Sequence, residues 1–185
     1  MVFMLMGAHG EIGAADDIWT LEDRAAAIVA AALLDGALDR AVQAAFVQDP
    51  EALKSMFAES SPLGSFGNRI NLGYLLGIYS KDARDDLRRI AKVRNRFAHS
   101  LAARKFTDDG IRDHCMNLKL VERYMIDAND PNRKLEPGDF MSYGVADSAE
   151  RLKEPRSRYT ETVALLHKGL QAVGGGVPVP GTPKF

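Results

Sequence analysis

The chain has 185 residues with 46% hydrophobic side chains, 24 lysines and arginines, 25 aspartates and glutamates, and a formal net charge of −1. This apolar content suits one globular core, no apolar run reaches the roughly 18 residues that a membrane-spanning helix needs, and the near-neutral charge gives little attraction to nucleic acid. The single cysteine, Cys115, excludes an intramolecular disulfide and a cysteine-rich zinc site, and the N-terminus lacks the basic start of a secretory signal, so we expect a cytoplasmic protein.

The first part of the chain is predicted to contain an arm and two helices. Residues 1–18 contain glycines and no sustained helical pattern, which is typical of a flexible arm. From Thr20 onward apolar residues recur at helical spacing, so the sequence predicts a helix over about 20–47 with Thr20 in a capping box. A second helix is predicted over about 51–58, followed by a Ser- and Pro-containing turn.

The middle of the chain is predicted to form two further helices. A mostly buried helix is expected over about 65–79, where Gly73 and Gly77 are predicted to let a neighbouring helix approach closely. Ser80 is placed to cap the next helix, over about 81–99. In that helix acidic residues occupy the first turns and basic residues the later ones, an order that complements the helix dipole.

The last part of the chain is predicted to contain two helices and a long connection. One helix is expected to begin near Thr107 and to reach Ile126. Residues 127–154 lack a helical pattern, and a connection of that length is usually mobile or covers a functional region. A final helix is expected over about 155–173, and the Gly- and Pro-rich residues 174–185 are expected to form a disordered tail.

These elements predict an all-α fold, with one bundle of about five or six helices over residues 19–173. The sequence shows no alternating strand pattern, no internal repeat and no phosphate-binding glycine loop within a strand–helix unit, so no cofactor is expected. Asp108 and Asp109 suit the first turn of a helix, and His114 beside Cys115 suits the edge of a core better than a metal site.

A local excess of positive charge is the main candidate binding feature. Residues 81–105 contain nine basic and three acidic side chains, a net charge of about +6 by that count. Such a segment is either a solvated face, an RNA site or a site for an acidic protein. The candidate contact residues on it are Arg88, Arg89, Lys92, Arg96, Arg104 and Lys105.

Arg94, Asn95 and His99 are the candidate catalytic residues of an alternative interpretation. On a straight helix, side chains five residues apart point about 140° away from each other, so Arg94 and His99 can act on one group only with a second chain. In a dimer cleft His99 would transfer a proton, Arg94 would stabilise a charged phosphorane and Asn95 would orient either group. Because that chemistry uses the ribose 2′-hydroxyl, the substrate would be RNA and no metal would be needed.

Four sequence blocks follow one another in a fixed order: Ser61-Pro62-Leu63-Gly64-Ser65-Phe66 with Arg69, Leu75-Leu76-Gly77-Ile78, Arg94 to His99, and Phe106-Thr107-Asp108-Asp109. These blocks resemble the mannitol operon repressor family, and the similarity covers about residues 20–126. Members of this family are small all-α proteins that lack a recognisable DNA-binding motif, so the resemblance implies regulation through a protein partner.

The Arg-Asn-x-x-x-His block also resembles the motif of HEPN-type helical domains. Arg94, Asn95 and His99 match that motif residue by residue. Many domains of this type are dimeric, metal-independent ribonucleases and toxins, while catalytically silent relatives are common. The resemblance therefore implies a HEPN-like helical fold more strongly than it implies activity.

Together these observations predict a small cytoplasmic transcriptional regulator, expected as a homodimer, that contacts a regulatory protein rather than DNA. The contact is expected on the basic helix or on the loop after Pro62, where Leu63, Phe66 and Arg69 are the candidate residues. No membrane contact is expected. The alternative is a toxin-like endoribonuclease that uses Arg94 and His99, and a third interpretation is a scaffold whose basic face is only solvated.

Overall fold

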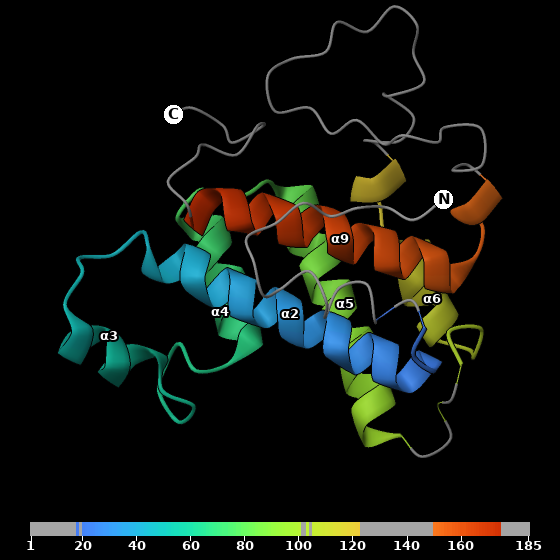
Figure 1. The fold of residues 1–185 in the computed structure, drawn as a ribbon, viewed down its shortest axis with the longest axis horizontal. Coiled ribbons are helices and arrows are strands. Elements are labelled where there is room, and N and C mark those ends of the chain that lie inside the picture. The colour runs from blue at the N-terminus through green and yellow to red at the C-terminus, as the bar shows by residue number, and fades with distance from the viewer. Residues whose placement is uncertain (1–17, 19, 101–102, 104, 123–149, 175–185) are drawn as a thin grey trace, which may run out of the picture.

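The computed structural model describes residues 18, 20–100, 103, 105–122 and 150–174. Within them the chain forms helices and no strand, which confirms the all-α prediction. Residues 1–17 of the predicted arm, residues 127–149 of the predicted connection and residues 175–185 of the predicted tail lie outside the described residues. The helices are α2 (Asp23–Gln43), α3 (Pro50–Phe57), α4 (Phe66–Leu75), α5 (Lys81–His99), α6 (Ile111–Met116) and α9 (Pro155–Gly174), shown in Figure 1.

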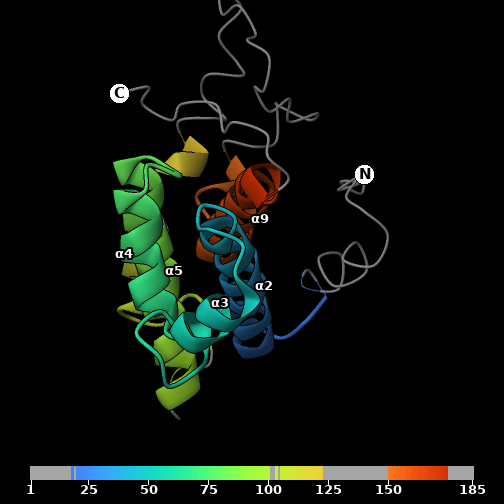
Figure 2. The same cartoon turned by 90° about the vertical axis from the view of Figure 1, so that its left-hand side faces the viewer.

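The longer helices form two layers around one core. Figure 2 shows α4 and α5 side by side in one layer and α2 with α9 in the other. The core face of α2 is largely alanine, which lets the neighbouring helices approach closely. Helices α2 and α9 run in the same direction. Their first turns meet where Arg156 contacts Asp23, and their last turns meet where Gly174 lies beside Arg40.

An aromatic cluster joins the two layers. The rings of Phe97 on α5 and Phe106 have centroids 5.2 Å apart, and Phe106 lies 5.1 Å from Tyr159 on α9. The buried Tyr159 hydroxyl donates a 3.0 Å hydrogen bond to the carbonyl of Ala27 on α2. These contacts place the exposed side of α5 on the outer surface of the bundle.

The first helix is shorter than predicted at both ends. It begins at Asp23 with Glu22 as a cap that makes no side-chain bond, so the predicted cap at Thr20 is wrong. The Asp23 carboxylate accepts hydrogen bonds from Arg156 and from the backbone N–H of Phe106, and therefore fixes the start of the helix by tertiary contacts. The helix ends at Gln43, and a turn follows in which the N–H of Phe46 donates to the carbonyl of Gln43.

Capping side chains mark the starts of two further helices. The Asp49 side chain accepts from the N–H groups of Glu51 and Ala52 at 3.0 Å, and Pro50 occupies the first position of α3. Ser80 caps α5 as predicted. No residue of α3 is buried, and in Figure 1 this helix extends away from the two layers.

The helix predicted over 65–79 ends at Leu75. Gly77 has a φ of 70°, its N–H bonds to the carbonyl of Tyr74, and the N–H of Ile78 bonds to the carbonyl of Gly73, which together form a Schellman C-cap. Gly73 does permit a close approach, and the approaching group is the Tyr79 side chain, whose hydroxyl oxygen would lie 2.6 Å from an added Cβ. At Gly73 the nearest group therefore comes from the segment before α5, and Gly77 forms the C-cap; the approach of a neighbouring helix stays a prediction.

The helix predicted to begin near Thr107 begins at Ile111 and ends at Met116. Gly110, with a φ of 78°, precedes it, and the Asp108 carboxylate accepts from the N–H of Lys105 in the preceding turn. After Met116 the N–H groups of Lys119 and Leu120 donate to the carboxylate of Asp86 on α5 instead of to helical carbonyls. This tertiary contact interrupts the helix that periodicity alone predicts.

Candidate functional site

Helix α5 carries four of the predicted contact residues, Arg88, Arg89, Lys92 and Arg96. Its inner side is buried through Ala83, Asp86, Leu87, Ile90, Val93 and Phe97, and its spacing therefore points the basic residues outward. Arg88, Lys92 and Arg96 are exposed, and Arg89 is half-buried. The structure thus presents a basic surface on a chain of near-neutral total charge.

The cations of this surface differ in how far other groups engage them. Arg84 pairs with Asp85 at 2.8 Å and lies 4.4 Å over the ring of Tyr74, while Arg88 donates to the side chain of Asn71. These contacts tie the first half of α5 to α4. Among the ion pairs of the described residues, none includes Lys92, which lies further along the helix.

Arg96 lies against the start of α6. A Cβ added to Gly110 would meet the Arg96 guanidinium at 2.8 Å, so the missing side chain of this glycine gives the guanidinium its place. The positive φ of Gly110 also favours glycine there. The Arg96 guanidinium therefore packs against Gly110, and no ion pair within the described part of the chain includes Arg96.

Arg69 is buried and makes contacts within the chain. Its side chain is 8% exposed, pairs with Asp35 and lies 3.5 Å from Asp39, both on α2. It also donates to the carbonyls of Leu63 and Gly64 at 2.9 and 3.1 Å. Arg69 therefore fixes the loop after Pro62 to α2, whereas its predicted contact with a partner has no support from this geometry.

The rest of the predicted loop contact is partly accessible. Leu63 and Phe66 are half-buried, and the Ser65 side chain caps α4 by accepting from the N–H of Asn68 at 3.2 Å. A Cβ added to Gly64 would lie 2.3 Å from the carbonyl oxygen of Ala58, so this loop is tightly folded. Contact of Leu63 and Phe66 with a partner stays a prediction.

Arg94, Asn95 and His99 are exposed near the C-terminal end of α5, which extends past α2 in Figures 1 and 2. Arg94 donates a 3.0 Å hydrogen bond to the Asn95 side chain. Since α5 is continuous to His99, the ideal helix places Arg94 and His99 about 140° apart. One chain therefore does not bring them together. Lys105 is exposed, and Arg104 lies outside the described residues.

The chain matches the sequence model described as "MtlR: Mannitol repressor" over residues 22–159. The chain belongs to the Mannitol repressor (MtlR) family. This confirms the resemblance that the ordered sequence blocks indicate.

Among solved structures, this family member is similar to a chain in the X-ray structure of the MtlR–HPr complex from Escherichia coli. The TM-score is 0.60 at 24% sequence identity, over 87% of this chain and 98% of that chain. At that identity the similarity shows the all-α fold. A comparison with curated proteins found no match.

In this member of the MtlR family, the described residues contain no group of three His, Cys, Asp or Glu side chains placed to hold a metal ion. No helix in the described part is both long and apolar enough to cross a membrane. Cys115 is buried, and burial raises the pKa of its thiol to about 12, so the thiol is protonated near neutral pH.

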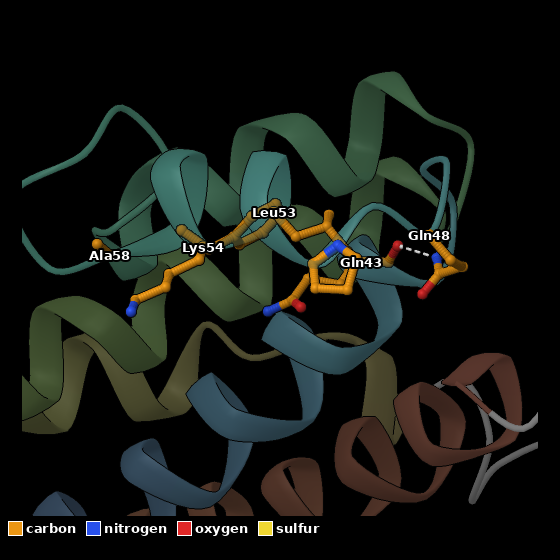
Figure 3. Close-up of a pocket in the computed structure, with 7 residues that line it drawn as sticks. Gln43, Gln48, Leu53, Lys54 and Ala58 are labelled. Atoms are coloured by element: carbon orange, nitrogen blue, oxygen red, sulfur yellow. Dashed lines mark hydrogen bonds between the residues drawn. The ribbon is translucent and has the colours of Figure 1, made fainter.

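A hollow between the end of α2 and α3 was not predicted. It is lined by polar and apolar side chains, with Lys54 as the charged one, and Figure 3 shows Gln48 bonded to the backbone of Gln43 beside it. Its lining residues are Gln43, Gln48, Pro50, Leu53, Lys54, Phe57 and Ala58. Lys54 is the single ionisable side chain in this set.

The position of His114 close to the cations of α5 could not be predicted from sequence spacing. His114 lies half-buried on α6, and burial together with the charges of Lys92 and Arg96 lowers its pKa. Asp113 opposes this effect. The charges of these α5 residues therefore act on His114 of α6.

Proposed function

We propose that this chain is a cytoplasmic transcriptional regulator of the MtlR family that acts by contact with a protein partner. Family membership over residues 22–159 is the observation that carries the proposal. The exposed basic surface of α5 supports it, because an α-helix that turns cations outward is a suitable surface for a protein partner. The formal charge of −1 argues against direct binding to operator DNA.

A protein of the HPr kind is the proposed partner. Support comes from the similar fold in the MtlR–HPr complex from Escherichia coli. We also propose that the chain acts as a homodimer. Its mass in solution, measured by light scattering, tests the dimer separately from the partner.

The test of function is calorimetric titration of the purified chain with HPr from its own host and with HPr from Escherichia coli. We expect saturable binding at micromolar concentration, about −8 kcal/mol in free energy. A gel-shift assay with promoter DNA is the parallel experiment, and we expect no sequence-specific shift by the chain alone. Specific DNA binding combined with no binding of HPr would refute the proposal.

The enzymatic alternative is favoured by one observation, the exposure of Arg94, Asn95 and His99 together near the end of α5. Because Arg94 and His99 point apart on one helix, a ribonuclease site would need residues from two chains. The Arg94 side chain also donates a hydrogen bond to Asn95, and such a bond between neighbouring surface side chains does not by itself indicate catalysis. We therefore place protein contact first and RNA cleavage second.

A further inference from the structure

Three cations form a line on the outer side of α5, and we name Arg89, Lys92 and Arg96 the α5 stripe. Their spacing of three and then four residues puts them on one side of the helix. Seven residues of helix span about 10.5 Å along the axis. The α5 stripe is therefore an elongated row of charge, not a point-like cluster.

Within the described residues, acidic neighbours pair with one of the three stripe cations, Arg89. Arg89 lies 3.2 Å from the Asp86 carboxylate, but Asp86 also accepts from the backbone N–H groups of Lys119 and Leu120 at 2.9 and 2.8 Å. Lys92 and Arg96 occur in none of the ion pairs found among the described residues. At least two positive charges thus face solvent without a carboxylate partner.

The stripe is also partly preorganised. Helix α5 is anchored on its inner side by the core, and Gly110 leaves room for the Arg96 guanidinium against α6. A side chain that is already positioned loses less conformational entropy when it binds. Burial lowers the pKa of His114 on α6 most, and the charges of Lys92, Arg96 and Arg89 lower it further, so the stripe lies near this side chain.

We propose that the α5 stripe is the docking site for an acidic segment of the protein partner, with carboxylates repeated at about one helical turn. This inference rests on the proposed function and adds the chemistry of the partner. A single phosphate, about 3 Å across its oxygens, would reach one of these cations, or two at most, along a row of about 10.5 Å. A short row of carboxylates matches the whole stripe.

A nucleic acid strand also carries repeated negative charge, but the rest of the chain disfavours it. The net charge is about +6 over residues 81–105 and −1 over the whole sequence, so the remaining residues are net negative. A long polyanion experiences that negative charge, whereas a short acidic segment contacts only the stripe. The charge distribution therefore favours the acidic protein segment over RNA.

The test uses a labelled, alanine-based helical peptide of about 18 residues with glutamates on one side at the spacing of the stripe. The first control is a peptide of the same composition with its glutamates placed all around the helix. The second is labelled oligouridine of about 15 nucleotides. Fluorescence anisotropy at low and high salt measures binding to the full chain.

The variants are Lys92→Glu and Arg96→Glu, with Lys81→Glu as the matched control. Lys81 is exposed on the same helix, and its substitution makes the same charge change about 16 Å from Lys92 along the axis. We expect the patterned peptide to bind the wild type, to weaken about tenfold or more with either stripe variant, and to change less than about twofold with Lys81→Glu. Added salt should weaken binding of the wild type most.

Three outcomes of the peptide assay would overturn the inference: equal binding of both peptides, unchanged binding by the stripe variants, or tighter binding of oligouridine than of the patterned peptide. Arg96→Gln removes the charge but keeps a polar side chain next to Gly110, so it tests whether binding is lost through charge and not through misfolding. Circular dichroism checks the folding of each variant. HPr separates the two proposals. If HPr binds the wild type and the Lys92→Glu variant equally well, the stripe is rejected as the docking site and the proposed function stands. If the patterned peptide binds but HPr does not, the proposed function is rejected and the stripe stands.

Discussion

Replacement of Asp86 by alanine should destabilise the bundle more than any other acidic substitution on α5. The Asp86 side chain is fully buried and accepts from the N–H of Leu120 at 2.8 Å and from the N–H of Lys119 at 2.9 Å. A buried donor that loses its acceptor costs about 1–3 kcal/mol. The Leu120 contact is buried and the Lys119 contact is partly accessible, so the combined loss is about 2–5 kcal/mol.

One effect acts in the opposite direction. Burial raises the pKa of Asp86 even though the two backbone N–H groups and Arg89 lower it, so the buried charge is itself costly. Its removal returns part of the loss, and we expect a net decrease of about 3 kcal/mol in the free energy of unfolding. That is a large fraction of the 5–15 kcal/mol that holds a typical domain folded.

Urea unfolding followed by circular dichroism measures this change, provided that the slope with urea stays constant. Asp85→Ala is the matched control, since Asp85 lies on the same helix and pairs with Arg84 near the surface, where a pair contributes about 1 kcal/mol or less. Asp86→Asn should fall between, because its amide oxygen can take the place of Oδ2, which accepts from both N–H groups, while the negative charge is lost. Equal stability of the Asp86→Ala and Asp85→Ala variants would refute the assigned role of Asp86.

The remaining predictions concern a helix end, pH and RNA. Gly77→Ala should lower the free energy of unfolding by about 1 kcal/mol because of its positive φ, whereas Gly67→Ala in the first turn of α4 should leave it unchanged or raise it, since an added Cβ there meets nothing within 4 Å. The pKa of His114 is lowered in the folded chain, so stability should fall as the pH drops below about 6.5; the urea midpoint of His114→Gln should fall less, and parallel curves would contradict this. Labelled RNA should stay intact with the wild type and with His99→Ala in the presence of chelator; cutting by the wild type that leaves cyclic phosphate ends and disappears in His99→Ala would instead establish the ribonuclease alternative.

The sequence predicts helices well where a local rule decides the structure. Ser80 begins α5 and Pro50 lies at the start of α3, as capping and proline geometry require. The errors occur where distant residues decide. Periodicity continues the helix that follows Gly110 past Met116, but the Asp86 carboxylate on α5 takes the N–H groups of the next residues.

The candidate site follows the same division. The charge excess of residues 81–105 is visible in the sequence, as is the angular separation of Arg94 and His99. Which cations remain available is not visible there, because it depends on partners in other elements. Arg69 shows this most clearly, since its acidic partner Asp35 lies 34 residues earlier on α2.

The two sides of α5 separate stability from binding. Asp86 faces inward and holds the chain after Met116, whereas Lys92 faces solvent and has no ion-pair partner among the described residues. Substitution of Asp86 should therefore reduce stability and affect binding only through unfolding, while Lys92→Glu should reduce binding at nearly constant stability. Arg89 contacts the Asp86 carboxylate at 3.2 Å and connects the two sides, so its variants should affect both properties.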